Sequence, residues 1–191
     1  MELEEAIRKR RSVRSFRPDP VPRGVLEKVL DLAQWAPSGM NQQNWYFVVV
    51  AGPRVDQLRQ VAREAFAEHV RPHLEQVFVD RPQVIDATGQ FFHQLGGAPV
   101  VLCVYHTPSV EGPLTDLQSV AAAVQNLLLA ACQEGLGACW MTGPVHLAER
   151  INQITGVHDK QLQAIIPIGY PAVEPPAPKR KQDRVLWIGW D

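Results

Sequence analysis

The chain alternates between segments with helical spacing of apolar residues and short continuous apolar runs. Apolar positions that recur every three or four residues predict amphipathic helices, and such segments lie at 22–33, 55–70, 115–131 and 147–154. Continuous apolar runs bounded by turn residues predict strands, and these lie at 45–50, 99–105, 137–141 and 164–170. This alternation predicts a single domain over residues 1–191, with one mixed sheet and helices on both of its faces.

Three local patterns refine this prediction. A short amphipathic segment at the start of the chain has Leu3, Ala6 and Ile7 on one face. The run at 99–105 is almost continuously apolar, as expected for a strand that is buried on both faces. Either Thr115 or Asp116 is expected to cap the long helix that follows this strand.

Two segments lack a clear pattern. Pro72 and Pro82 interrupt residues 71–97, so this region is either a mobile lid over a pocket or an ordinary helical connection. The prolines at 175–178 predict an extended tail, which ends in the apolar stretch 185–190. Because contiguous apolar surface usually marks a contact site, we expect this tail to pack either onto a second copy of the chain or back onto its own.

Composition and charge narrow the class of protein. A formal net charge of −1 over 191 residues argues against a general nucleic-acid binder, which would carry a large basic excess. Cys103, Cys132 and Cys139 are odd in number and lie among apolar residues, so we expect buried, reduced thiols. The sequence also lacks a leader-like start and an apolar run long enough to cross a bilayer. We therefore expect a soluble cytoplasmic protein that binds neither nucleic acid nor membrane.

The familiar motifs of catalysis without a bound organic cofactor are missing. Gly135-Leu-Gly137 follows a predicted helix, whereas a dinucleotide fingerprint follows a strand. The sequence has no phosphate-binding loop and no nucleophile elbow of a serine hydrolase. His69 and His73 share one helical face, but Pro72 lies between them and argues against a metal site. If the protein is an enzyme, a cofactor is expected to carry the chemistry.

Two polar segments are candidates for binding that cofactor. Arg10-Arg11-Ser12-Val13-Arg14 places guanidinium groups and a hydroxyl on one side of extended backbone, where they match the oxygens of a phosphate. A second basic cluster, 179–181, lies near the far end of the chain. The loop at 37–45 is rich in side-chain amides, which match the edge of a planar heterocycle. The alternatives are a solvated basic run and an ordinary turn.

Together these segments resemble the nitroreductase family of flavoproteins over nearly the whole chain. The resemblance is carried, in this order, by Arg10-Arg11-Ser12-Val13-Arg14, Ala36-Pro37-Ser38-Gly39-x-Asn41-x-Gln43-x-Trp45, Gln125-Asn-Leu-Leu-Leu-Ala-Ala131, Gly135-Leu-Gly137, Gly169-Tyr-Pro171 and Lys179-Arg180-Lys181. It implies an α+β fold, a three-layer α/β/α sandwich with a mixed central sheet, in a homodimer that exchanges C-terminal tails. It also implies two FMN molecules at the subunit interface and NAD(P)H as the reductant.

The same resemblance assigns cofactor-binding roles to residues and names no catalytic side chain. The phosphate and ribityl chain of FMN would be held by Arg10, Arg11, Ser12 and Arg14, with Lys179, Arg180 and Lys181 reaching the phosphate from the tail. Pro37, Ser38 and Gly39 of the other subunit would cover the flavin, with Asn41 and Gln43 near its ring. Met141, Thr142 and Gly143 would line the ring on its N5 side.

Departures from the family pattern bear on the reaction. Asn44 occupies a position where the family commonly has proline, and Gln182 in the tail occupies another. The Pro-Ser-Gly and Lys-Arg-Lys sequences also resemble the reductive dehalogenase branch, which includes iodotyrosine deiodinase. That branch grips its substrate with a lid Tyr and Lys, and neither residue type occurs between Phe47 and Val104. Gly143 stands where that branch places a hydroxyl near N5, which favours two-electron over one-electron chemistry.

The function predicted from this resemblance is an FMN-dependent NAD(P)H oxidoreductase. It would reduce nitroaromatic, quinone or similar small-molecule acceptors by hydride transfer with ping-pong kinetics. One alternative is a dehalogenase-like or flavin-consuming enzyme on the same fold. The other is a non-enzymatic module whose basic ends bind an acidic partner or nucleic acid.

Overall fold

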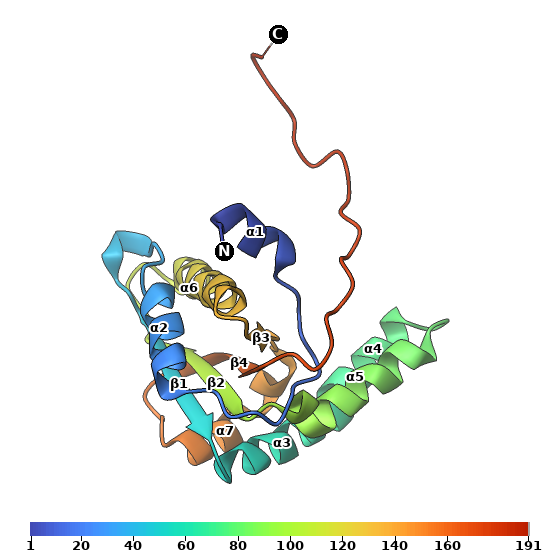
Figure 1. Cartoon of the computed structure of the whole chain (residues 1–191). Helices are drawn as coiled ribbons and strands as arrows, with labels where there is room; N and C mark the ends of the chain where they lie inside the picture. The colour runs from blue at the N-terminus through green and yellow to red at the C-terminus, as the bar shows by residue number, and fades with distance from the viewer. Residues whose placement is uncertain (191) are drawn as a thin grey trace.

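The computed structural model describes residues 1–190, and its centre is a four-stranded sheet in the order β1-β2-β4-β3 (Figure 1). The strands are β1 (Trp45–Ala51), β2 (Val100–His106), β3 (Gly137–Ala138) and β4 (Gln161–Gly169). Every residue of β2 is buried, as its apolar run predicts. The third strand is shorter than predicted, because the chain leaves the ladder after Ala138 and returns only for a bridge between Met141 and Ile165.

The prediction of a mixed sheet is wrong for these strands. All three strand pairings are antiparallel, and the one parallel pairing in residues 1–190 is a single bridge between Ser12 and Ala138. An apolar run identifies a strand but not the direction of that strand. The direction depends on the end of the sheet at which the preceding connection enters the strand.

Seven α-helices surround the sheet in the described part of the chain: α1 (Leu3–Lys9), α2 (Arg23–Ala33), α3 (Arg54–Ala65), α4 (Arg71–Val77), α5 (Pro82–Gln94), α6 (Pro113–Gln133) and α7 (Ala148–Thr155). Alternate residues of β2 enter two separate cores. Val101 and Cys103 pack with α3 and α5, whereas Leu102 and Val104 pack with α2 and α6. The sheet is therefore covered by helices on both faces, as predicted.

The region 71–97, which the sequence left undecided, is helical. A turn of π-helix, η2 (Phe66–Val70), joins α3 to α4, and α5 follows after a short turn. Pro72 and Pro82 lie in the first turns of α4 and α5, where the missing N–H has no helical partner to lose. The two helices form an arm that projects from the body of the molecule (Figure 1).

The predicted cap of the long helix is wrong. Helix α6 begins at Pro113, one turn before Asp116, and follows Gly112 with a φ of 86°. Proline is well suited to the first helical position, so the helix starts earlier than the capping residues suggest. Asp116 lies buried in the first turn and binds other parts of the chain.

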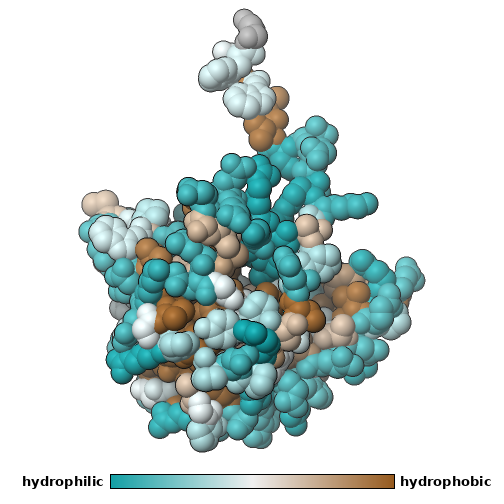
Figure 2. Space-filling model, in the orientation of Figure 1, coloured by the Kyte–Doolittle hydropathy of each residue, from teal (hydrophilic) through white to brown (hydrophobic). Residues whose placement is uncertain are grey.

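Parts of the segment 171–180 line cavities together with α1 and with residues of the segment 10–13, and the tail beyond it extends away from the body (Figures 1 and 2). Its apolar end does not pack back onto the chain within residues 1–190: Val185, Leu186, Trp187, Ile188 and Trp190 are 67–82% exposed. Packing onto a second copy stays a prediction. No helix in the described residues is long and apolar enough to cross a membrane.

Candidate functional site

The basic segment 10–14 lies along the short strand β3. Val13 donates its backbone N–H to the carbonyl of Ala138 over 3.0 Å and buries its side chain. A Cβ on Gly137 would lie 2.6 Å from Val13, so glycine at this position permits the close approach. The flanking Ser12 and Arg14 are exposed, which agrees with the predicted alternation of side chains.

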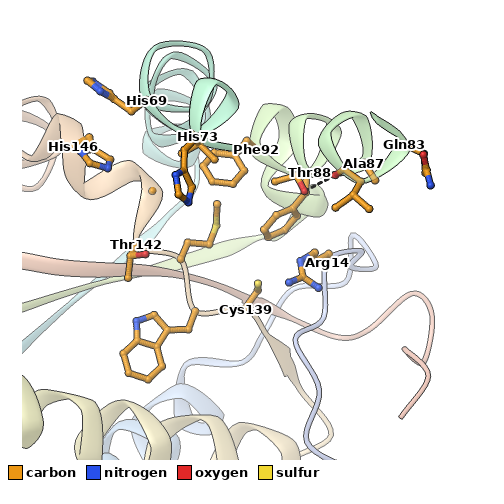
Figure 3. Close-up of a pocket in the computed structure, with 16 residues that line it drawn as sticks. Arg14, His69, His73, Gln83, Ala87, Thr88, Phe92, Cys139, Thr142 and His146 are labelled. Atoms are coloured by element: carbon orange, nitrogen blue, oxygen red, sulfur yellow. Dashed lines mark hydrogen bonds between the residues drawn. The ribbon is translucent and has the colours of Figure 1, made fainter. Parts of the chain in front are cut away.

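Arg14 lines a cavity of about 700 Å³ (Figure 3). The predicted residues Met141, Thr142 and Gly143 line the same cavity. Gly143 begins the 3₁₀-helix η4 (Gly143–Leu147), so its backbone N–H is a terminal donor without an acceptor inside the helix. The structure thus brings together Arg14, which was predicted to bind the phosphate, and the segment 141–143, which was predicted to line the flavin ring.

The opposite wall of this cavity comes from the arm. Helix α5 contributes Thr88, Phe91 and Phe92, and the Arg14 guanidinium carbon lies 5.9 Å from the centre of the Phe91 ring. These residues could not be predicted, because the pattern of 71–97 does not show which helix face points inward. A Cβ on Gly143 would lie 2.7 Å from Val70, so the small residue allows the arm to pack closely.

Arg10 does not share the Arg14 cavity. Arg10 and Arg11 line a second cavity of about 330 Å³. The two cavities are neighbours along the chain, because Ala138 lines the second and Cys139 lines the first. The common contact of residues 10, 12 and 14 with one anion stays a prediction.

Arg11 also connects the beginning of the chain with the tail. Arg11 and Arg180 line one cavity of about 590 Å³ between α1 and residues 177–180. The Arg11 Nη1 donates to the carbonyls of Arg8 and Arg10, but its Nε is buried without a hydrogen-bond partner. Lys179 and Lys181 lie beside Arg180 in the exposed tail.

The described part of the chain does not neutralise these cations. Within residues 1–190, no carboxylate forms an ion pair with any of six predicted binding residues: Arg10, Arg11, Arg14, Lys179, Arg180 and Lys181. Surface arginines are usually free to pair with nearby carboxylates, and the chain has 20 acidic residues. The unpaired cations and the orphaned Arg11 Nε fit an anionic ligand such as the phosphate of FMN.

The predicted loop 37–43 lies elsewhere. Figure 1 places the segment after α2 on the side of the molecule opposite the α4–α5 arm. The Gly39 N–H donates to Ser119 Oγ over 3.3 Å, and a Cβ on Gly39 would lie 2.3 Å from a methyl carbon of Thr115. Gly39 is therefore held against α6, and none of Pro37, Ser38, Gly39, Asn41 and Gln43 lines the Arg14 cavity of the same chain.

This loop is fixed in an uncommon conformation. Met40, Asn41 and Gln43 have φ values of 47°, 55° and 46°, a region that residues other than glycine rarely adopt. Ser38 Oγ accepts a hydrogen bond from the Gln43 N–H over 2.9 Å, and Asn41 Oδ1 accepts one from Gln43 Nε2 over 2.9 Å. The loop is thus held by its own hydrogen bonds before any ligand contacts it.

Asn44, the departure from the family pattern, joins a buried polar network. Its Nδ2 donates to Asp116 Oδ1 over 2.7 Å and to the Thr107 carbonyl over 3.2 Å. Asp116 also accepts the Ser109 N–H and hydroxyl, and His106 Nε2 lies 3.8 Å away. The Ser109 hydroxyl, followed by its N–H, lowers the pKa of Asp116 from its ordinary value.

The cysteines are free thiols, and two of the three are buried as predicted. The prediction is wrong for Cys132, which is only half-buried because it lies on α6 in the wall of the second cavity. Burial raises the pKa of Cys103 to about 12 and also raises that of Cys139. Cys139 lines the Arg14 cavity, but as a neutral thiol it is not an activated nucleophile.

A comparison with known protein families matches residues 7–170 to the family described as "Nitroreductase family". The chain belongs to the nitroreductase family of flavin oxidoreductases. It is 33% identical, over 184 residues, to the Methanothermobacter thermautotrophicus protein named "Putative NADH dehydrogenase/NAD(P)H nitroreductase". That match covers 92% of this chain and 80% of its relative.

Two further matches are a dehalogenase relative and a solved structure. The iodotyrosine deiodinase of Thermotoga neapolitana is 31% identical over 188 residues, covering 96% of this chain and 95% of the enzyme. A crystal structure described as a putative nitroreductase in complex with FMN, from Desulfovibrio desulfuricans, superposes with a TM-score of 0.73 at 27% identity. That superposition covers 95% of this chain and 93% of the other. The predicted nitroreductase-like α+β fold is confirmed.

His69, His73 and His146 line the cavity together, and the sequence did not predict this grouping. His69 and His73 were considered only as metal ligands on one helix, and His146 lies more than 70 residues away in the chain. Their convergence depends on how η2, α4 and η4 pack, which the local sequence pattern does not report. No group of residues within 1–190 is arranged to hold a metal ion.

Proposed function

We propose that the protein is an FMN-dependent NAD(P)H oxidoreductase that reduces nitroaromatic, quinone or similar small-molecule acceptors. The observation that carries the proposal is the cavity of about 700 Å³ in which unpaired Arg14 faces the segment 141–143. Membership of the nitroreductase family and the named relatives support the cofactor and the reductant.

The chain offers different groups to the two ends of FMN. Arg14, with Arg10, Arg11 and Ser12 on the same segment, supplies donors for the phosphate and ribityl chain. Lys179, Arg180 and Lys181 supply further positive charge from the tail. The N–H of Gly143, at the start of η4, supplies a donor for the edge of the ring. When bound, FMN supplies reversible hydride chemistry, which lets reductant and acceptor use one cavity in turn.

The remaining wall residues orient substrates and exclude water. Phe91, Phe92 and Met141 form an apolar surface suited to a flat aromatic molecule. Thr88 and Thr142 add hydroxyl groups that can orient its polar substituents. No side chain is assigned a covalent or acid–base role, since positioning accounts for the contribution of the protein.

We also propose that the working unit is a homodimer in which the loop 37–43 of one subunit covers the flavin of the other. Two features support it. The loop is fixed far from the Arg14 cavity of its own chain (Figure 1), and the apolar tail end is exposed. Met40 on the loop and Leu117 on α6 are also exposed, at 78% and 47%, and would be covered by a partner.

A dehalogenase-like activity is the second candidate, because a relative 31% identical over 96% of this chain is an iodotyrosine deiodinase. Residues 48–103 contain no tyrosine or lysine, so the substrate grip expected for that branch has no counterpart here. Nitroreductase activity is therefore the first to be tested.

The test begins with the absorbance of the purified protein. Bound flavin should absorb at about 450 nm, and anaerobic NAD(P)H should bleach that band before a nitroaromatic or quinone restores it. The variant Arg14→Ala should lose most of the flavin, whereas Arg63→Ala, an exposed arginine on α3, should keep it. A colourless wild-type protein that does not bind added FMN would refute the proposal. Release of iodide from iodotyrosine would favour the second candidate.

A further inference from the structure

Half of the histidines of the chain gather at one side of the Arg14 cavity. His69 comes from η2, His73 from α4 and His146 from η4, and all three line the cavity and are exposed to solvent. The rings of His69 and His146 stack with centres 4.8 Å apart and planes 21° apart. In Figure 3, the three rings lie at one side of the cavity and Arg14 lies at the other.

The charges around this cluster are unbalanced. Among residues 1–190, no aspartate or glutamate lines the cavity. On the elements packed around it, Glu64 of α3 pairs with Arg150 of α7, and Glu75 pairs with Arg71 on α4. Asp56 of α3 pairs with Arg59. The acids without a Lys or Arg partner are Glu68, which lies 3.8 Å from His69 and is 59% exposed, Asp86 on α5 and Glu149 on α7, and solvent screens all three because they are exposed. The cavity therefore offers N–H donors and positive charge without a competing carboxylate inside it.

The histidine cluster is not arranged to hold a metal ion within residues 1–190. It suits an anion, which can accept hydrogen bonds from several imidazole rings at once. Arg14 is the group that the proposed function assigns to FMN, and the histidines are at the other side. An anion at the histidines would thus belong to the second compound in the cavity.

We propose that His69, His73 and His146 form a subsite for an anionic group, carboxylate or phosphate, on the compound that exchanges electrons in this cavity. The proposal rests on the proposed oxidoreductase function and narrows its substrates to acidic ones. The anion has two possible sources. One is the extra phosphate that distinguishes NADPH from NADH, and the other is a carboxylate on the acceptor.

Pairs of substrates that differ only in charge test this subsite. The ratio of kcat/KM is measured for NADPH against NADH and for 4-nitrobenzoate against 4-nitrobenzamide. The variants are His73→Gln, the double variant His69→Gln with His146→Gln, and all three changes together. The control is His93→Gln, an exposed histidine on α5 that does not line the cavity.

In the wild type, the charged member of at least one pair should be preferred. The triple variant should lower kcat/KM for that member by about tenfold, with less than about a twofold change for the neutral member. A change confined to NADPH identifies the nucleotide phosphate as the anion, and a change confined to nitrobenzoate identifies the acceptor. Equal losses for charged and neutral members, or no loss, would overturn the proposal.

Equilibrium binding gives a readout that needs no turnover. Trp140 lines the same cavity, so its fluorescence can report titrations of the FMN-saturated protein. Benzoate is compared with benzamide, and adenosine 2′,5′-bisphosphate with adenosine 5′-monophosphate. If neither anion binds more tightly than its partner in the wild type, or if the triple variant keeps the preference, the subsite is refuted. Failure to reduce any neutral acceptor would instead refute the proposed function, and the titration would still decide the subsite.

Discussion

The buried carboxylate of Asp116 provides the sharpest stability prediction. The residue is 2% exposed and accepts hydrogen bonds from the Ser109 N–H over 2.9 Å, the Ser109 hydroxyl over 2.5 Å and the Asn44 amide over 2.7 Å. These bonds tie the end of the loop 37–44 and the β2–α6 connection to the first turn of α6. Asp116→Asn keeps the shape of the side chain but replaces one acceptor oxygen by a donor.

The expected loss follows from these contacts. One buried donor, on Ser109 or Asn44, would face the new amide nitrogen, and an orphaned donor costs about 1–3 kcal/mol. The other bonds would lose their charge assistance, which removes about 1 kcal/mol more. We therefore expect Asp116→Asn to lower the free energy of unfolding by about 2–4 kcal/mol. For a chain of this length that corresponds to a fall in Tm of roughly 4–16 °C.

The effect has a predicted pH dependence. Because the pKa of Asp116 is lower in the folded protein than its ordinary value of 3.8, the ionised carboxylate stabilises the fold above that value. This stabilisation is lost as the pH falls through the folded pKa. The difference between wild type and Asp116→Asn should thus be full at pH 7 and should shrink below about pH 4.

Urea unfolding followed by tryptophan fluorescence at fixed protein concentration measures this difference. The matched control is Asp159→Asn, which changes an exposed carboxylate beside Lys160 and should leave the urea midpoint unchanged. A difference below about 0.5 kcal/mol between wild type and Asp116→Asn at pH 7 would refute the reasoning. So would a full-sized difference that persists at the acidic end of the titration.

Three further predictions concern other parts of the fold. Tyr105→Phe removes a buried hydroxyl that shares a 2.8 Å hydrogen bond with Thr155, and should cost about 1 kcal/mol in urea unfolding; an unchanged midpoint would contradict this. Cys103 and Cys139 should resist a charged thiol reagent until the protein unfolds, as peptide mass spectrometry can show, since both are buried and their pKa values are raised. Removal of residues 185–191 should shift the protein to a monomer in sedimentation analysis and weaken FMN binding, and a truncated chain that stays dimeric would contradict the proposed tail exchange.

The sequence predicted elements whose signal is local. Residues 100–105 of the run at 99–105 are fully buried in β2, and the spacing at 55–70 becomes α3 followed by η2. Pro72 and Pro82 were ambiguous for a physical reason: proline breaks the interior of a helix but suits its first turn, and a pattern without a clear start cannot distinguish the two. Strand direction was also missed, because it depends on how connections return to the sheet.

The same distinction applies to the site. Arg14 and the segment 141–143 were predicted from motifs and do line one cavity. The role of Asn44 required its partner Asp116, which lies 72 positions later and was interpreted as a helix cap. The histidine cluster required three elements to converge, although His69 and His73 were visible as a pair. Motifs predicted the residues expected to bind the cofactor. The residues that line the rest of the cavity come from distant elements, and motifs did not predict them.

The position of the loop 37–43 sets a condition on any functional assembly. The loop is fixed against α6 by the hydrogen bond from the Gly39 N–H to Ser119 Oγ, and its own shape is held by the bond from the Gln43 N–H to Ser38 Oγ. Moving it to the Arg14 cavity of its own chain would require breaking those contacts. A second copy related by a twofold axis removes this requirement, because each surface then meets its counterpart on the other subunit. One such axis would complete two sites at once and would cover the exposed tail ends. If the loop does contact flavin, the buried network around Asp116 therefore stabilises a surface that acts in the neighbouring subunit.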